Sequence, residues 1–249
     1  MRTSGLAVVA MGLVMGVAAA QAAAAAPVTI VLVGDSTVNA GGGWGKGFCE
    51  IVTRNVTCIN EALNGRSTKS FVDEGAWAKS LADKGNYYLI QFGHNDQKPD
   101  AKRHTDPQTT YQEYLRRYIA DVRALGAVPV LVTSLSRRTY RDGKVIEDLN
   151  EYAAAARAVG QAEHVAVIDL NAMSTKLLDT MTQQQADAFD AETHPDAQAE
   201  NSGKAAPKLD RTHLNAKGQA VFGRMVADEL VRQVPELRGD VVPAQEAAK

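Results

Sequence analysis

The 249-residue sequence has few aromatic residues, few cysteines and no large excess of either charge. Aromatic residues make up 6% of the chain and its formal net charge is -2 at pH 7. It therefore lacks the basic surface and the stacking platform that are typical of nucleic-acid-binding proteins. The two cysteines, Cys49 and Cys58, are too few to build a metal site by themselves. We expect no nucleic-acid partner and no metal.

The spacing of these cysteines leaves two alternatives. Cys49 and Cys58 are nine positions apart, which is close enough for a disulfide between a helix and the next strand in an oxidising compartment. Two unpaired buried thiols fit the same spacing almost as well. We expect the disulfide.

Long hydrophobic runs are absent except at the N-terminus. Arg2 precedes the apolar run LAVVAMGLVMGVA, and an alanine-rich stretch with several small-residue cleavage sites follows before Pro27. The run is too short and too rich in alanine to predict a membrane span, although a retained anchor is the alternative. We expect a signal peptide over residues 1–26 and a secreted or periplasmic monomer with no stable membrane insertion.

Five short runs rich in β-branched residues follow, at 28–33, 56–59, 87–92, 128–133 and 165–170. Segments with helical spacing lie at 110–125, 148–160 and 215–234, the last with Asn215 as its N-cap. Strands that alternate with helices predict a parallel sheet with helices on both faces. The stretch 183–208 has no strand signal, which indicates a functional or disordered loop. Residues 237–249 are expected to form a flexible tail.

Glycines and polar residues follow the first three of these runs. The sequence reads GDS at 34–36, NGRS at 64–67 and GHND at 93–96, and DRTH at 210–213 precedes the last helix. Ligands of parallel sheets bind beyond the carboxyl ends of the strands. These four segments are therefore expected to meet at one site.

Together they supply the groups that acyl transfer needs. Ser36 is a nucleophile if a base removes its proton, and His213 is the candidate base. Asp210 is three residues earlier and can fix the imidazole tautomer. The backbone N–H of Ser36, at an expected helix start, the N–H of Gly65 and the side-chain amide of Asn95 are candidate oxyanion donors.

Structural alternatives exist for these residues. Ser36 can be a helix N-cap, Gly65 and Asn95 can serve a tight turn, and Asp210 with His213 can bind a metal, although no further ligand stands at a telling spacing. Asp35 and Asp96 are expected to order their loops. The glycine-rich stretch 41–47 fails the phosphate-loop pattern and is expected to be a mobile loop.

Candidate substrate contacts lie close to these segments. Arg66 can contact an acidic sugar, His94 neighbours an oxyanion donor, and Trp77 can stack on a sugar. The structural alternatives are a solvated face for Arg66 and packing for His94 and Trp77.

The four segments, in this order, resemble the SGNH (GDSL-like) hydrolases, and most closely their rhamnogalacturonan acetylesterase branch, which includes bacterial pectin acetylesterases. The similarity covers about residues 28–234, and we expect one such domain over 27–236. It implies a flavodoxin-like three-layer α/β/α sandwich whose five-stranded parallel sheet has the order 2-1-3-4-5. It also implies a Ser36, Asp210 and His213 triad and an oxyanion hole of Ser36, Gly65 and Asn95.

The resemblance further implies deacetylation of a plant cell-wall polysaccharide without metal or cofactor. We therefore expect a serine esterase that removes O-acetyl groups from rhamnogalacturonan. One alternative is a lysophospholipase or thioesterase that acts on longer acyl chains. The other is a polysaccharide-binding domain without catalysis.

Overall fold

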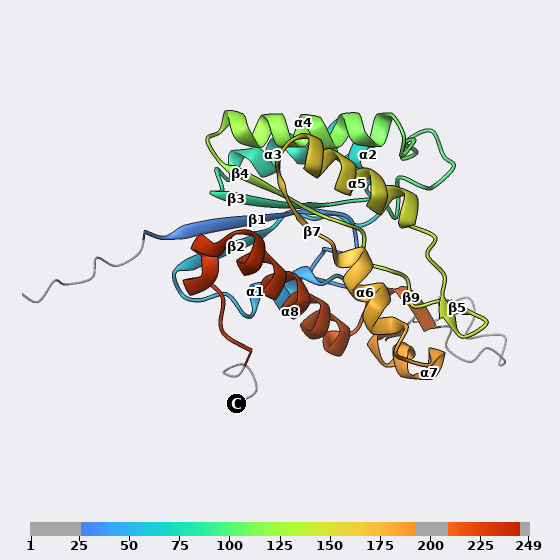
Figure 1. Cartoon of the computed structure of the whole chain (residues 1–249). Coiled ribbons are helices and arrows are strands. Elements are labelled where there is room, and N and C mark those ends of the chain that lie inside the picture. The colour runs from blue at the N-terminus through green and yellow to red at the C-terminus, as the bar shows by residue number, and fades with distance from the viewer. Residues whose placement is uncertain (1–25, 193–208, 245–249) are drawn as a thin grey trace, which may run out of the picture.

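A five-stranded parallel sheet forms the centre of the computed structural model, which describes residues 26–192 and 209–244 (Figure 1). Its strands are β1 (Val28–Gly34), β2 (Val56–Asn60), β3 (Tyr87–Gln91), β4 (Val128–Val132) and β7 (Ala166–Ile168). Their spatial order is β2-β1-β3-β4-β7, which confirms the predicted order with β7 as the fifth strand. The predicted signal peptide lies outside the described residues except for its last position.

Helices cover both faces of this sheet, so the molecule has three layers (Figure 1). One face carries α2 (Thr68–Asp73), α3 (Ala76–Ala82), α4 (Thr110–Ala124) and α5 (Asn150–Ala162). The other carries α1 (Gly45–Cys49), α6 (Leu170–Leu178) and α8 (Ala216–Gln233). The sheet is therefore buried on both sides, which explains why its strands are almost continuously apolar in sequence.

Strand β1 shows how the two hydrophobic cores form. Ile30 and Leu32 belong to the core beneath α1 and α8, whereas Val31 and Val33 belong to the core beneath α2 to α5. The alternation follows from the strand geometry, in which successive side chains point to opposite faces. All four side chains are fully buried, and each contributes about 1.5–3 kcal/mol to folding by leaving water.

The stretch 183–208 differs from its prediction over its first ten residues. They form α7 (Gln183–Ala186), a 3₁₀ turn η1 (Asp187–Phe189) and the strand β8 (Asp190–Glu192), which pairs with β9 (Leu209–Leu214). The side chain of Phe189 packs edge-on against Phe222 of α8. Of the two alternatives for this stretch, disorder is therefore wrong for 183–192, which also contains a strand that was not predicted, and residues 193–208 lie outside the described part. A second small pair, β5 (Tyr140–Arg141) and β6 (Lys144–Val145), forms a hairpin.

The C-terminal segment is also more ordered than predicted. A 3₁₀ helix η3 (Pro235–Gly239) follows α8, and Leu237 and Val241 are buried in the core. Val241 forms a β-bridge with Val52, and the N–H of Val242 donates to the carbonyl of Ile51. The expected flexible tail is thus packed at least to residue 242, because its apolar residues cover the end of the sheet.

A disulfide joins Cys49, at the end of α1, to Cys58 in β2. Of the two alternatives for these cysteines, the structure therefore contains the bridge. It links α1 to the edge strand of the sheet, so the segment that follows β1 is tied to the fold at both ends.

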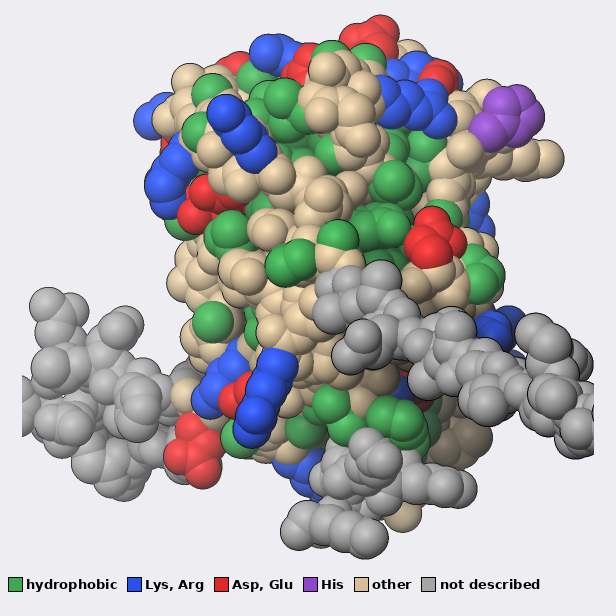
Figure 2. Space-filling model, turned by 90° about the vertical axis from the view of Figure 1, so that its left-hand side faces the viewer, with side chains coloured by type: hydrophobic (Ala, Val, Ile, Leu, Met, Phe, Trp, Pro, Cys, Tyr) green, Lys and Arg blue, Asp and Glu red, His purple; other side chains and the backbone are tan. Residues whose placement is uncertain are grey.

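The two ends of the sheet differ. Figure 2 shows the face at the amino ends of the strands, where Lys, Arg, Asp and Glu side chains are interspersed with hydrophobic ones. The glycine-rich and polar segments noted above follow the carboxyl ends, on the opposite side of the molecule.

None of the helices in 26–192 and 209–244 has the length and apolar character that crossing a bilayer requires.

Candidate active site

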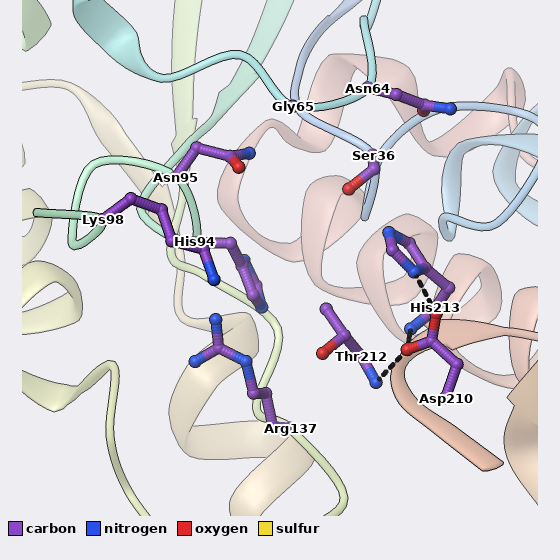
Figure 3. A pocket seen from close by; sticks show the side chains of 10 residues that line it. All are labelled: Ser36, Asn64, Gly65, His94, Asn95, Lys98, Arg137, Asp210, Thr212 and His213. Carbon is purple, nitrogen blue, oxygen red and sulfur yellow. Dashed lines mark hydrogen bonds and ion pairs between the residues drawn. The ribbon is translucent and has the colours of Figure 1, made fainter. Parts of the chain in front are cut away.

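A pocket of about 310 Å³ lies beyond the carboxyl ends of β1 and β3 (Figure 3). All five residues predicted for catalysis and oxyanion binding line it: Ser36, Gly65, Asn95, Asp210 and His213. Five further residues complete its walls: Asn64, His94, Lys98, Arg137 and Thr212. Segments that are far apart in the sequence therefore meet where the parallel sheet predicts.

Ser36 follows β1 in a tight turn that its neighbours hold in place. The Oδ1 atom of Asp35 accepts hydrogen bonds from the N–H and the hydroxyl of Thr37, at 2.8 and 2.7 Å. A Cβ at Gly34 would lie 2.5 Å from the carbonyl oxygen of Gln91, so only glycine fits before the turn. Helix α1 begins nine residues after Ser36, so this serine is neither a helix N-cap nor placed at a helix start.

A chain of buried hydrogen bonds supports the turn from below. The indole of Trp44 donates to Oε1 of Gln91 at 2.8 Å, and Nε2 of Gln91 donates to Oγ1 of Thr37 at 2.6 Å. Trp44 is fully buried. The expectation of a mobile loop at 41–47 is therefore wrong, because its tryptophan anchors that loop in the core.

His213 and Asp210 lie on β9 and are hydrogen-bonded to each other. Nδ1 of His213 is 2.6 Å from Oδ2 of Asp210, and the other carboxylate oxygen accepts from the backbone N–H groups of Thr212 and His213. The β8–β9 pairing has a register shift at this point, so a bulge lets residues three apart on a strand turn toward each other. Burial alone would raise the pKa of Asp210, but these hydrogen bonds outweigh it and hold the pKa below its usual value.

The remaining ring nitrogen of His213 points toward Ser36 (Figure 3). Within the described ranges no hydrogen bond joins the two side chains, although both line the same pocket. Hydrogen bonds between catalytic groups often tighten only when a substrate is bound, so this arrangement is compatible with proton transfer from the serine.

Arg138 holds the backbone of His213 from behind. This arginine is fully buried, its Nη2 donates to the carbonyl of His213 at 2.8 Å, and its Nε is paired with Asp190. Its own N–H donates to the carbonyl of Arg211 at 3.0 Å. Arg138 is not predictable from the sequence, because an arginine in the run SRR after a strand gives no sign that it will be buried.

Gly65 and Asn95 present donors to the pocket from two different loops. Gly65 has φ +77°, and a Cβ there would meet no atom within 4 Å, so glycine is needed for its backbone conformation and not for space. Nδ2 of Asn95 donates one proton to the carbonyl of Arg66 at 3.1 Å, which orients the amide. Its second amide proton is left for the pocket that this side chain lines.

Asp96 fastens these two loops together. Its carboxylate accepts hydrogen bonds from the N–H and the hydroxyl of Thr68, the N–H of Gly93 and the hydroxyl of Thr105. Burial raises the pKa of Asp96 to about 6, against the effect of these donors. The expected structural role of Asp96 in the third loop thus agrees with its contacts.

The chain matches a known protein family. Residues 32–221 match the GDSL-like Lipase/Acylhydrolase family. This chain belongs to that family. It is a carboxylic ester hydrolase, and the predicted resemblance to SGNH (GDSL-like) hydrolases is confirmed.

The relatives of this GDSL-family esterase include carbohydrate esterases. It is 35% identical to the rhamnogalacturonan acetylesterase RhgT of Bacillus subtilis, over 81% of this chain and 89% of that protein. It is 38% identical to the probable rhamnogalacturonan acetylesterase YesY of Bacillus subtilis, over 57% of this chain and 69% of that protein.

Solved structures show the same fold. The Bacillus subtilis protein YxiM superposes with a TM-score of 0.67 at 24% identity, over 83% of this chain and 56% of that chain. An acetylxylan esterase from Geobacillus stearothermophilus has a TM-score of 0.59 at 15% identity, over 84% of this chain and 94% of its own. At these identities the two structures support the three-layer architecture alone.

One predicted substrate contact of the esterase, Trp77, is wrong, and another, Arg66, lies outside the pocket. Trp77 is 2% exposed, its ring packs edge-on against Tyr118, and its indole donates to Asp121 at 2.8 Å. Arg66 is not among the residues that line the pocket, and its guanidinium is paired with Glu74 at 2.8 Å on the surface. Trp77 is part of the core, and Arg66 contributes a backbone carbonyl that orients Asn95.

The third, His94, does line the pocket of the esterase. It is buried, and its Nδ1 lies 3.7 Å from Oδ2 of Asp35, beyond hydrogen-bond distance. Burial lowers the pKa of His94, and the nearby Asp35 carboxylate opposes this only in part. The imidazole of His94 is therefore neutral near pH 7, and within the described residues neither of its ring nitrogens has a hydrogen-bond partner.

Proposed function

We propose that this esterase removes O-acetyl groups from an acetylated pectic polysaccharide, with rhamnogalacturonan as its first substrate. RhgT, which is named for that activity, matches most of both chains at 35% identity. The observation that carries the proposal is the convergence of Ser36, the His213–Asp210 pair and two further donor residues on one small polar pocket. A polar pocket suits a sugar that carries a short acyl group.

In the proposed mechanism, Oγ of Ser36 attacks the acetyl carbonyl while Nε2 of His213 takes its proton. Asp210 holds the imidazole in the required tautomer and stabilises the imidazolium that forms. The oxyanion of the tetrahedral intermediate accepts hydrogen bonds from the N–H groups of Ser36 and Gly65 and from the amide of Asn95.

Collapse of this intermediate breaks the ester bond. The imidazolium of His213 returns the proton to the sugar oxygen, which leaves as a hydroxyl, and the acetyl group remains on Ser36. Water then gives a proton to His213 and attacks the acetyl-enzyme. The imidazolium passes that proton to Oγ of Ser36 as the ester bond breaks, which restores the serine hydroxyl and releases acetic acid, which ionises to acetate. The proposed cycle uses no cofactor.

The character of the pocket favours acetyl groups over long acyl chains. None of the ten residues that line it is Leu, Ile, Val, Met, Phe, Tyr or Trp. A lysophospholipase or thioesterase needs an apolar cleft for its acyl chain. A binding domain without catalysis has no use for a carboxylate that orients an imidazole beside a serine, so the His213–Asp210 hydrogen bond disfavours that alternative as well.

We also propose that the mature protein is secreted or periplasmic. The expected signal peptide at residues 1–26 supports this location, and so does the Cys49–Cys58 disulfide, since disulfides persist in oxidising compartments. Fractionation of cells, with determination of the N-terminal residue of the exported protein, tests this proposal. Recovery of the uncleaved chain in the cytoplasm alone would contradict it.

The test of function is acetate release from matched substrates. Acetylated rhamnogalacturonan, acetylated xylan and an octanoyl ester are compared, and we expect the highest kcat/KM on rhamnogalacturonan and the lowest on the octanoyl ester. Ser36→Ala should abolish release while leaving the melting temperature unchanged. The proposal fails if the octanoyl ester is the best substrate or if Ser36→Ala retains most of its activity.

A further inference from the structure

Two cationic side chains line the wall of the pocket that lies across from Ser36. Lys98 follows β3 and Arg137 follows β4, and their charged ends point toward one another at the edge of the cavity (Figure 3). Neither group belongs to the nucleophile, the base or the oxyanion donors. We infer that Lys98 and Arg137 bind the carboxylate of a uronic acid residue and so select acidic over neutral acetylated sugars. This inference rests on the proposed function and deepens it.

The carboxylates near Lys98 and Arg137 do not neutralise both side chains. Arg137 is mostly buried, and its Nη1 lies 2.5 Å from Oδ2 of Asp148, which fixes the guanidinium and balances one charge. The rest of the guanidinium stays available on the pocket side. Among the described residues no carboxylate lies within ion-pair distance of Lys98. Two like charges that face each other repel, and a bound carboxylate removes that repulsion while accepting charge-assisted hydrogen bonds from both.

His94 gives a second, independent indication of a polar ligand at this wall. It is 3% exposed, it lines the same pocket beside Lys98, and both of its ring nitrogens are without a partner in the described part of the chain (Figure 3). Buried polar groups are nearly always hydrogen-bonded in native proteins. Nδ1 of His94 faces the Asp35 carboxylate at 3.7 Å, beyond hydrogen-bond distance. A sugar oxygen or carboxylate held by Lys98 and Arg137 would therefore provide a hydrogen-bond partner that His94 lacks.

The dimensions of a uronic acid fit between Ser36 on one wall of the pocket and Lys98 and Arg137 on the other. The pocket of about 310 Å³ is at the small end of the range for small-molecule sites, which fits one sugar ring and its acetyl group. In a hexuronate the hydroxyl at C2 lies across the pyranose ring from C5, which carries the carboxylate. A 2-O-acetyl group presented to Ser36 therefore places the carboxylate toward Lys98 and Arg137. Xylose has no group at that position, so it would leave Lys98 without a counter-ion, while Arg137 would keep only Asp148.

The test compares two small substrates that differ only in the carboxylate. Acetylated methyl galactosiduronate and its carboxyl-reduced counterpart, acetylated methyl galactoside, are hydrolysed by the wild type and by Lys98→Gln. We expect the wild type to prefer the acid, and Lys98→Gln to lower the ratio of the two kcat/KM values about tenfold, mainly through KM. Raised salt should reduce the preference of the wild type.

Two further variants control for general effects of charge and folding. Lys98→Arg keeps the cation and should retain most of the preference. Lys84→Gln removes an exposed lysine just before β3, at the amino ends of the strands, and should leave the ratio unchanged. Arg137→Gln should lower the ratio like Lys98→Gln.

The inference is overturned if the wild type does not prefer the acid, or if Lys98→Gln leaves its preference intact. This outcome differs from failure of the proposed function. An enzyme that prefers the small acid substrate but leaves acetylated rhamnogalacturonan untouched has the carboxylate site without the proposed polysaccharide activity. An enzyme that deacetylates rhamnogalacturonan but does not prefer the small acid substrate has the proposed function and lacks the carboxylate site.

Discussion

Two histidine–aspartate pairs flank Ser36, and they differ in exposure and in bonding. In one, His213 is about one-third exposed and lies 2.6 Å from Asp210. In the other, His94 and Asp35 are buried and their nearest atoms are 3.7 Å apart. An imidazole can serve as a base only if the substrate can reach it and if its charged form is stabilised. Of the two pairs, only His213 and Asp210 therefore meet both conditions for a catalytic base.

The difference comes from the backbone that carries each pair. Asp210 and His213 lie on a bulged strand at the rim, where the carboxylate is directed to the imidazole by two backbone N–H groups. Asp35 follows a central strand, and its Oδ1 is occupied by the N–H and hydroxyl of Thr37. Asp35 therefore shapes the turn that presents Ser36, while Asp210 orients the proposed base.

Replacing the two histidines should separate the pairs most clearly. We expect His213→Ala to lower kcat for an activated acetate ester by roughly ten-thousand-fold, because the serine loses its base. His94→Ala should lower it far less, since its ring does not take up the proton. Steady-state kinetics of both variants measures this contrast, and losses of equal size would contradict it.

Replacing the two aspartates should give a smaller contrast of the same kind. Asp210→Asn is expected to reduce kcat by roughly a thousand-fold with little change in stability, because the imidazole loses its preferred tautomer. Asp35→Ala should instead lower the free energy of unfolding by about 1–3 kcal/mol, because the N–H and hydroxyl of Thr37 lose their acceptor in the interior. Kinetics and urea unfolding of both variants check this, and an Asp35→Ala variant as stable as the wild type would contradict it.

Arg138 is expected to matter for the exposed pair through stability. Arg138→Ala should cost about 3 kcal/mol, because it leaves Asp190 buried without its partner and frees the carbonyl of His213. The double variant Arg138→Ala/Asp190→Ala should recover part of this loss, since no charge then remains unpaired. Additive losses in urea unfolding would show that the two residues do not act as a pair.

The buried His94 should also affect how the free energy of unfolding depends on pH. Because the pKa of His94 is lowered in the folded protein, the unfolded chain binds its proton first as the pH falls below about 6.5. Stability contributed by neutral His94 is therefore complete above that pH and is lost as the pH falls toward the lower folded value. His94→Gln should show a flatter stability curve between pH 7 and 5, and superimposable curves would contradict this assignment.

The sequence was sufficient for the parts of the site that depend on local pattern. Ser36, Gly65 and Asn95 follow apolar strands, and the carboxyl ends of neighbouring parallel strands meet at one edge. Asp210 and His213 were predicted because DRTH stands last among the four segments that resemble SGNH hydrolases and because the two residues are three positions apart. The strand order was predicted from the same resemblance.

The parts that the sequence missed depend on contacts between distant segments. Trp77 was predicted to bind a sugar, but its side of α3 faces α4, as only the packing shows. Arg138 becomes buried because Asp190 and the His213 carbonyl, far along the chain, surround it. Lys98 and Arg137 follow different strands, so nothing in either local sequence shows that their charges face each other.

Labelling with a fluorophosphonate probe tests the central claim most directly, because only an activated serine reacts with it. The exposed His213–Asp210 pair should make Ser36 the labelled residue in the intact protein, as peptide mass mapping would show, and His213→Ala should abolish the label while His94→Ala retains it. A wild-type protein that stays unlabelled at Ser36, or one whose label survives His213→Ala, would contradict the account.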